Sequence, residues 1–190
     1  NSIGPSFPFP HETPMSEHNA FTLQVQPLTR EAFAPFGELI EACDAVQHFT
    51  INAGNTERYH DLANIEPGPE GRVIVSIFRG QPRSLPFCVQ MMERHPLASQ
   101  AFIPMSGRPY LVVVAPAGEP PAVQDLKVFL ARADQGVNYA TGVWHHPLLA
   151  LDGVCDFIVI DRKGTGHNCD EIQLERHGII PPISHSRYAP

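Results

Sequence analysis

Short runs of β-branched and aromatic residues recur along the chain. Side chains of these types favour strands, and glycine or proline lies in most of the gaps between the runs, as expected where short strands end. The pattern predicts a mostly β protein, a closed barrel or a sandwich with one or two short helices, rather than alternating strands and helices. The predicted strands cover residues 39–40, 49–51, 73–78, 87–91, 110–114 and 154–160.

Two segments carry helix signals. A short helix is expected to begin after Thr29, whose hydroxyl suits an N-cap, and to end at Gly37, with Phe33 and Phe36 on its inner side. A second helix is predicted at residues 122–133, because apolar side chains recur there every three or four residues. One face of that helix would pack on the sheet.

The length of 190 residues suits a single domain with irregular ends. Four prolines occur among the first fourteen residues, and no periodicity is present there, so residues 1–21 are predicted to be a Pro-rich flank. Residues 22–175 are expected to form the folded domain that carries the functional site. Residues 176–190 contain three further prolines and are predicted to be an irregular tail.

The chain is acidic, since 13 Lys and Arg against 20 Asp and Glu give a formal net charge of −7. Without a run of basic residues, a nucleic-acid partner is not expected. No apolar stretch approaches the roughly 20 residues of a membrane span, and no signal-peptide pattern opens the chain, so no membrane partner is expected. The four scattered cysteines form no C-x-x-C pair, which favours a reducing, cytoplasmic location.

Missing motifs exclude several enzyme classes. The sequence has no G-x-S-x-G nucleophile elbow, no G-x-G-x-x-G after a strand and no phosphate-binding P-loop. No cysteine has a neighbouring partner that would activate it as a nucleophile. Elbow-type hydrolases, dinucleotide-binding enzymes and P-loop proteins are therefore not expected.

Acid–base and ligand groups concentrate in residues 93–104 and 135–147. In the first segment His95 comes two residues after Glu93 and directly before a proline, which favours an extended backbone at a strand end. Gln100 follows five residues later. Two interpretations remain open: His95 caps a turn beside a surface glutamine, or both residues belong to a site.

In the second segment the only tryptophan, Trp144, is followed by His145 and His146. Adjacent side chains on a strand point to opposite faces, so only one of these histidines can face a barrel interior. The sequence does not determine which one. The alternative is a buried aromatic corner in which both histidines are hydrogen-bonded structural residues.

Two arginines are candidates for holding an anionic ligand. Arg79 ends the predicted strand at residues 73–78, and Arg58 precedes a Tyr-His-Asp turn. At a pocket mouth, the planar guanidinium of either residue would hold a carboxylate through two hydrogen bonds. The alternative interpretation of each residue is a solvated surface arginine. Asp161 and Arg162 directly follow the last predicted strand. They are interpreted as either a structural or a functional ion pair.

Several of these segments, taken together and in order, resemble the ureidoglycolate lyase family. The resemblance covers about residues 22–173, and so many matching blocks in one order are a specific signal. The blocks lie at residues 26–37, 57–63, 93–104, 135–147, 156–162 and 168–171.

The resemblance implies a cupin-like closed β-barrel or jelly roll that assembles as a homodimer. It further implies cleavage of (S)-ureidoglycolate to glyoxylate and urea, a step of allantoin and purine degradation. A divalent metal, with nickel as the ion associated with the family, is implied as a cofactor. His95 and His145 are then the expected ligands, since imidazole suits nickel or zinc.

The chemistry of this substrate assigns roles to the candidates. One carbon carries a carboxylate, a hydroxyl and a urea nitrogen, so the reaction must remove the hydroxyl proton and deliver a proton to the departing urea. Imidazole is matched to both tasks near neutral pH. We expect the pair to be His95 with either His145 or His146, while Gln100 and Tyr139 hydrogen-bond the urea or the hydroxyl.

The substrate carboxylate is expected to be held by Arg79 or Arg58, with His60 as a further candidate from the same turn as Arg58. Two other function classes stay open. Another metal-dependent cupin enzyme, an oxygenase or isomerase, predicts tightly bound iron or zinc and no urea release. A non-catalytic metabolite-binding barrel predicts binding of small acids without turnover.

Overall fold

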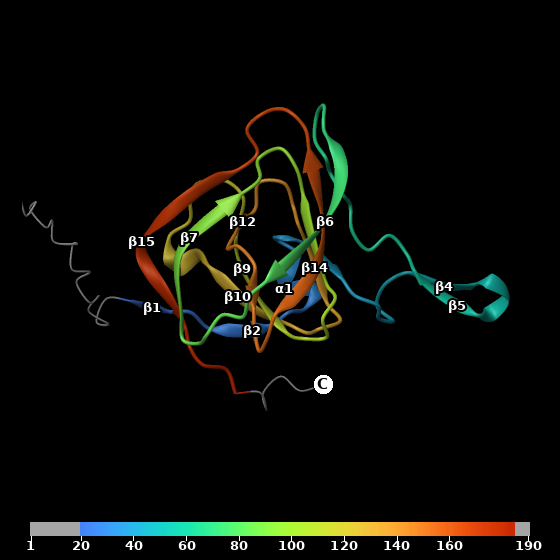
Figure 1. The fold of residues 1–190 in the computed structure, drawn as a ribbon, viewed down its shortest axis with the longest axis horizontal. Helices are drawn as coiled ribbons and strands as arrows, with labels where there is room; N and C mark the ends of the chain where they lie inside the picture. Colours follow the sequence, from blue (N-terminus) through green and yellow to red (C-terminus); the bar gives the residue numbers. More distant parts are fainter. Residues whose placement is uncertain (1–19, 185–190) are drawn as a thin grey trace, which may run out of the picture.

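The computed structural model describes residues 20–184 and shows two β-sheets that pack together as a cupin-like barrel (Figure 1). The predicted mostly β fold is confirmed, and each of the six predicted strands overlaps an observed one. The larger sheet has eight strands. In spatial order these are β1 (Phe21–Thr22), β15 (Asp170–Ile180), β7 (Phe87–Arg94), β12 (Trp144–His145), β9 (Tyr110–Ala115), β10 (Lys127–Ala131) and β2 (Val25–Pro27), with β13 (Leu149–Ala150) paired to β9.

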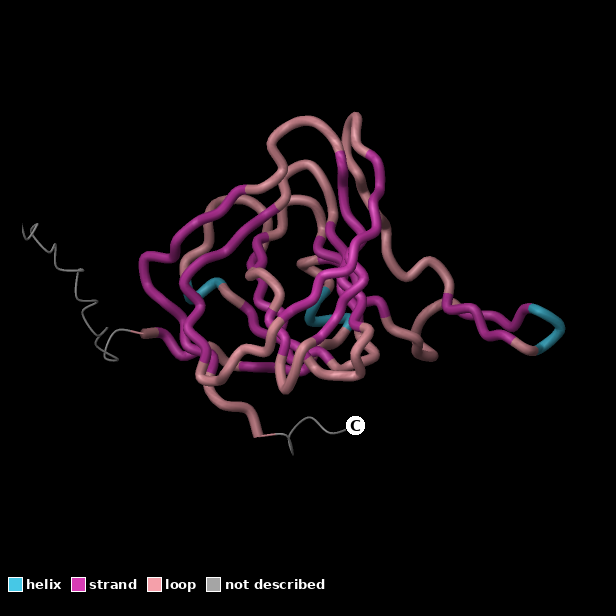
Figure 2. Tube along the Cα trace, in the orientation of Figure 1, coloured by secondary structure: helices cyan, strands magenta, loops and turns pink. Residues whose placement is uncertain are grey.

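The smaller sheet has five antiparallel strands and faces the larger one. Their order is β3 (Gly37–Ile40), β11 (Gly136–Tyr139), β8 (Gln100–Pro104), β14 (Cys155–Lys163) and β6 (Arg72–Gly80). A separate hairpin extends away from the barrel (Figures 1 and 2). It consists of β4 (His48–Ile51) and β5 (Thr56–Tyr59), joined by the 3-10 turn η2 (Asn52–Gly54).

Strand β9 lies between two hydrophobic cores. Tyr110 and Val112 point into the core between the two sheets, whereas Leu111 and Val113 point into a second core inside the curl of the larger sheet. Both faces of the strand are therefore buried, and the sequence of such a strand is continuously apolar rather than alternating. This continuous apolar run explains why residues 110–114 can be predicted as a strand from the sequence.

The first predicted helix is present as α1 (Arg30–Phe33). The Thr29 side chain accepts a hydrogen bond from the backbone N–H of Ala32, as an N-cap should, and Phe33 is buried. The element is a single turn that ends before Gly37, which instead begins β3.

The second predicted helix, at residues 122–133, is wrong. A 3-10 turn, η3 (Val123–Asp125), is followed by β10, which pairs with β9 on one side and β2 on the other. Val128 and Phe129 are adjacent in sequence and both almost fully buried, one in each core. Burial of both faces of a strand gives a cluster of apolar residues that imitates helical spacing.

The C-terminal boundary also differs from the prediction. β15 extends past residue 175 to Ile180, so residues 176–180 belong to a strand; its pairing with β7 shifts register between Gln173 and Gly178, after which Gly178 to Ile180 pair with the start of β7. Residues 1–19 of the predicted flank and residues 185–190 of the predicted tail lie outside the described residues. Within residues 20–184, no helix has the length and apolar character needed to cross a membrane.

Candidate active site

Three side chains of types that can hold a metal ion meet between the two sheets. One ligand atom from each of Glu93, His95 and His145 lies within 4.8 Å of the others. Glu93 lies on β7 and His95 is the first residue after that strand, so the alternation of the strand continued by one residue places both on the same side. His145 lies directly opposite Glu93 in the β12–β7 pairing. The position of all three is thus set by strand alternation and register.

Main-chain carbonyl groups orient both imidazoles. The Nδ1 atom of His95 lies 2.7 Å from the carbonyl oxygen of Asn168, and that of His145 lies 3.0 Å from the carbonyl oxygen of Val143. A carbonyl oxygen only accepts, so each Nδ1 carries the proton and donates it, which leaves Nε2 with a lone pair in the neutral ring. This is the arrangement that supports metal-ligating histidines.

The Nε2 atom of His145 faces the carboxylate of Glu93 at 3.4 Å. It is buried and has no hydrogen-bond partner within residues 20–184. Burial raises the pKa of Glu93, but the imidazole of His145 at 3.4 Å and the charges of the neighbouring histidines outweigh that effect and lower the pKa overall. Glu93 is therefore a carboxylate at neutral pH, beside a nitrogen that lacks a partner.

Gln100 adds an oxygen to the same space. Its Nε2 atom donates to Oδ2 of Asp161 at 3.1 Å, and its Oε1 atom lies 3.0 Å from Nε2 of His95. Because a carboxylate only accepts, Asp161 fixes the amide with its oxygen towards His95. Two acceptors, this oxygen and the Nε2 lone pair of His95, then face each other, and a cation is needed between them.

The donor set fits a divalent metal ion. Two imidazole nitrogens and one carboxylate converge, their orientation is fixed by outer hydrogen bonds, and a carbonyl oxygen from Gln100 lies beside them. Nitrogen and oxygen ligands of this kind suit nickel, zinc or iron. A proton held between His95 and Gln100 would satisfy the same two acceptors.

Tyr139 packs flat against His145. The ring centroids are 4.3 Å apart and the planes differ by 9°, and Tyr139 is almost fully buried. Burial, and secondarily the charge of Glu93, raises the pKa of Tyr139 well above its ordinary value. Its phenol therefore stays protonated and can act only as a neutral hydrogen-bonding group.

His146 lies on the other side of the strand, as alternation requires. Its Nδ1 atom is 2.8 Å from the carbonyl oxygen of Pro147, and its ring meets Phe87 edge to face at 5.4 Å. Burial lowers the pKa of His146. The structure thus answers which of the two adjacent histidines faces the inter-sheet space: His145 does.

The two predicted carboxylate-binding arginines are not brought to this cluster. Arg79 forms a two-point ion pair with Asp156, at 2.8 and 2.9 Å, and its side chain is 69% exposed. Asp156 is five residues from Asp161 along β14, roughly 16 Å at the rise of a strand. Arg58 lies on the β4–β5 hairpin, where its guanidinium covers the ring of Phe49.

His60 follows the hairpin and also packs on Phe49, with ring centroids 5.5 Å apart.

Two residues of the cluster are not assigned a role from the sequence: Glu93 is recognised only as a neighbour of His95, and Asp161 is either a structural or a functional residue. The Glu-x-His spacing at a strand end was a usable signal for Glu93, because residues two apart on a strand share a face. The contact of Asn168 with His95 depends on a loop and has no such signal.

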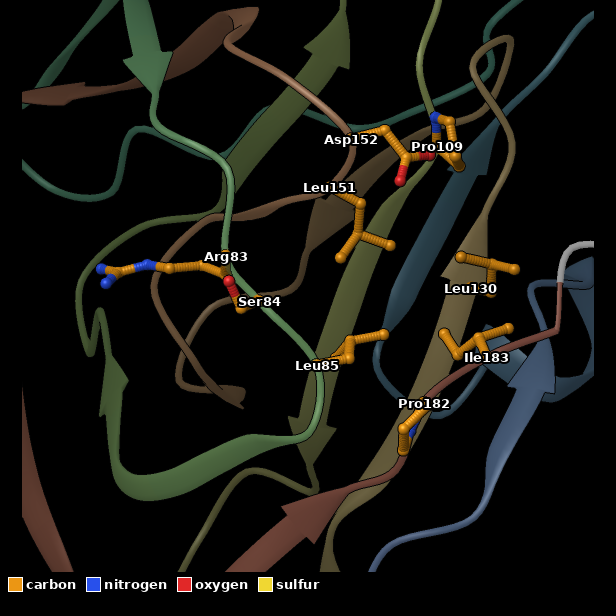
Figure 3. Close-up of a pocket in the computed structure, with 9 residues that line it drawn as sticks. All are labelled: Arg83, Ser84, Leu85, Pro109, Leu130, Leu151, Asp152, Pro182 and Ile183. Carbon is orange, nitrogen blue, oxygen red and sulfur yellow. The ribbon is translucent and has the colours of Figure 1, made fainter.

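A cavity of about 440 Å³ lies elsewhere in the barrel (Figure 3). Leu85, Leu130 and Leu151 point into it, while Arg83 points away. None of the cluster residues lines this cavity. Its walls are mostly apolar, which suits the polar chemistry of the cluster poorly.

Comparison with known proteins gives a consistent picture. A family profile described as "Ureidoglycolate lyase" matches residues 20–181, a range that includes the whole cluster. The ureidoglycolate lyase of Burkholderia mallei (strain NCTC 10229) is 58% identical over 154 residues, 80% of this chain and 89% of that protein. The one from Rhizobium etli (strain CIAT 652) is 56% identical over 161 residues, 83% and 95% of the two chains. The one from Pseudomonas putida (strain W619) is 53% identical over 151 residues, 79% and 90%.

Proposed function

The chain belongs to the ureidoglycolate lyase family, and on this premise we propose that it is a carbon–nitrogen lyase that cleaves (S)-ureidoglycolate to glyoxylate and urea. The observation at the site that carries the proposal is the convergence of Glu93, His95 and His145 beside Gln100. The family match does not favour the alternatives, another metal-dependent cupin enzyme or a non-catalytic metabolite-binding barrel.

The reaction is balanced without water. The hydroxyl proton leaves the central carbon's oxygen, that oxygen forms the carbonyl of glyoxylate, and the carbon–nitrogen bond breaks as urea accepts a proton. The buried Nε2 atom of His145 has a single free lone pair, which is suited to take the proton and return it to the nitrogen when no metal ion occupies it. Gln100, whose oxygen is held towards the cluster, is suited to accept an N–H from the urea group.

We propose that Glu93, His95 and His145 hold a divalent metal ion, with nickel the ion suggested by the family resemblance. Such an ion supplies a Lewis acid that lowers the pKa of a nearby hydroxyl. The donor chemistry supports this proposal, because two oriented imidazoles and a carboxylate point to one place.

Metal analysis is expected to find about one divalent ion per chain after dialysis. Replacing Glu93 with glutamine removes the anionic ligand and should lower the bound metal, whereas His146→Gln should not. A chelator should reduce urea release, and nickel should restore it. Wild-type protein that is fully active without bound metal would instead assign the two histidines to proton transfer alone.

Activity itself is tested by following both products. Wild-type protein supplied with ureidoglycolate should release urea and glyoxylate in equal amounts. Release of neither product from protein that binds metal normally would reject the lyase proposal and leave the metal site standing.

Asp161→Asn should reduce kcat/KM by roughly 10–100-fold, as for other residues that orient a ligand group. An asparagine amide can donate to Gln100 as well as accept, so it no longer fixes which end of the Gln100 amide faces His95. The control is Asp156→Asn, on the same strand but paired with Arg79. Equal losses in both variants would show that the carboxylate of Asp161 has no particular role.

The predicted roles of Arg79 and Arg58 in holding the substrate carboxylate remain to be tested. Because Arg79 is paired with Asp156 away from the cluster, we expect Arg79→Ala to leave KM close to that of the wild-type enzyme. Steady-state kinetics with ureidoglycolate would measure this. A large rise in KM would restore Arg79 as a substrate-binding residue.

We also propose that the enzyme acts in allantoin and purine degradation, in the cytoplasm, as a homodimer. All four cysteines are free, which is in keeping with a reducing compartment. Small-molecule recognition is supported by the family match, and the acidic charge does not favour nucleic acid.

A further inference from the structure

Arg94 lies next to the cluster in sequence but on the opposite face of β7, because side chains alternate along a strand. Glu93 lies opposite His145 on β12, so the next pair along these antiparallel strands is Arg94 with Trp144. On its other side Arg94 pairs with Asp170 of β15. We use the name Arg94 row for Trp144, Arg94 and Asp170. This row backs the side of β7 and β12 that carries the cluster.

The guanidinium of Arg94 holds three partners at once. Its Nε atom donates to Oδ2 of Asp170 at 2.8 Å, and its Nη1 atom donates to the carbonyl oxygen of Gly118 at 2.7 Å. Its Cζ atom lies 4.5 Å from the ring centroid of Trp144. The indole nitrogen of Trp144 donates to the same Gly118 oxygen at 3.2 Å. One planar group therefore ties β15 and β12 to the end of β7.

On the β15 side, the Arg94 row fixes the oxygen that orients His95. Asp170 is two residues after Asn168, whose carbonyl oxygen lies 2.7 Å from Nδ1 of His95. The Asn168 side chain also accepts from the backbone N–H of Leu97 at 2.9 Å. The second oxygen of Asp170 lies 2.6 Å from Nε2 of His167. The short stretch that contains Asn168 is thus held at both of its ends.

On the β12 side, the row fixes the oxygen that orients His145. The backbone nitrogen of Trp144 is bonded to the carbonyl carbon of Val143, and the oxygen of that carbonyl lies 3.0 Å from Nδ1 of His145. Trp144 is almost fully buried. Holding its indole ring between Arg94 and Gly118 therefore also holds the peptide group that His145 contacts.

Both imidazoles lie between two acceptors, so the position of each main-chain oxygen decides which nitrogen carries the proton. The Nε2 atom of His95 is 3.0 Å from the oxygen of Gln100, and that of His145 is 3.4 Å from the carboxylate of Glu93. If the main-chain oxygen moved away from Nδ1, the proton would be better held on Nε2. An Nε2 atom that carries a proton in the neutral ring can neither bind a metal ion nor accept a second proton.

We propose that Arg94 is a positioning residue that keeps Nε2 of both His95 and His145 free of a proton. It acts through Asp170 on one side and Trp144 on the other, by placing the two main-chain oxygens. The inference rests on the proposed function, in which these Nε2 atoms bind a metal ion or accept a proton. Its first test, however, needs neither substrate nor metal.

Nitrogen-15 NMR of the histidine rings, in the full chain after chelator treatment, reports which nitrogen is protonated. Arg94→Lys keeps the charge but replaces the planar fork with a single ammonium group, which cannot hold the same partners in the same geometry. Both His95 and His145 should then show a larger share of the Nε2–H tautomer than in the wild-type chain. Asp170→Asn should shift His95 alone, because Asp170 contacts Arg94 only on the β15 side.

Nickel affinity and kcat/KM are measured on the same variants. Both should fall by roughly 10–100-fold in Arg94→Lys, as for other residues that orient metal ligands. The control is Arg132→Lys, because Arg132 also pairs with carboxylates, those of Glu41 and Asp134, but lies outside the cluster and the Arg94 row. Arg132→Lys should leave the tautomers and the nickel affinity unchanged.

A chain in which Arg94→Lys lowers the unfolding temperature but leaves both tautomers unchanged would overturn the proposal, since Arg94 would then serve only the fold. An equal tautomer shift in Arg132→Lys would overturn it too. If Arg94→Lys does not fold, Asp170→Asn decides the question, because Asp170 is only partly buried, and an unaltered His95 ring would reject the inference. A tautomer shift in a chain that releases no urea would reject the lyase proposal and leave this inference standing.

Discussion

His145→Ala is expected to lower kcat/KM for ureidoglycolate by roughly 10²–10⁴-fold, the usual contribution of an acid–base group, and by at least as much if the residue holds a metal ion instead. The buried Nε2 atom of His145 faces Glu93 and has no hydrogen-bond partner in the described chain, so it is available to a substrate or an ion. Coupled assays of urea and glyoxylate release would measure the loss.

The adjacent histidine provides a matched control. His146 is partly buried, but it lies on the opposite side of the strand against Phe87, so His146→Ala should retain most of the activity. Thermal unfolding of both variants separates a chemical loss from a packing loss, since His145 also stacks on Tyr139. The assignment fails if His146→Ala is the inactive variant and His145→Ala the active one.

Phe157→Ala is expected to lower the free energy of unfolding by about 3–5 kcal/mol, the cost of truncating a fully buried phenylalanine. Phe157 has no exposed surface and meets the ring of Tyr110 edge to face at 5.0 Å. It lies in the core that joins the two sheets, so the cavity left behind weakens the contact between the sheets. Urea denaturation at equilibrium would give the change, provided that the m-value is unaltered.

Ile158→Ala is the control for Phe157→Ala. The two residues are neighbours on β14, but Ile158 points to the outer face and keeps part of its surface exposed. Its truncation should cost much less than that of Phe157. Comparable losses at the two positions would mean that the outer face is as tightly packed as the inner one, as would follow if a second chain covered it throughout the denaturation experiment. Repeating the measurement at lower protein concentration distinguishes that case.

Much of the fold was predictable because strands buried on both faces leave a strong local signal. The run at residues 110–114 is apolar throughout and forms β9 between two cores. The same double burial caused the error at residues 122–133, where Val128 and Phe129 face opposite cores and imitate a helical pattern. The spacing of apolar residues in the sequence cannot distinguish a strand buried on both faces from an amphipathic helix. The difference depends on which other element packs against the second face.

The candidate site was predictable in part for a similar reason. His95, Gln100, His145 and Tyr139 lie in two compact segments, and the structure brings these four side chains together. The placement of Arg79 was not predictable, because it depends on the β14–β6 register that puts Asp156 opposite it. Register is set by long-range pairing, and no local pattern reports it.

The two imidazoles of the cluster take their orientation from main-chain oxygens at Val143 and Asn168. Every residue has a main-chain carbonyl oxygen, whatever its side chain. Substituting residue 143 therefore leaves in place the oxygen that accepts from the protonated nitrogen of His145. Insertions and deletions differ from substitutions in this respect. One residue added near Val143 or Asn168 would move the carbonyl oxygen away from the imidazole that it orients. In this enzyme, loop length should be held under tighter selection around the two histidines than loop composition.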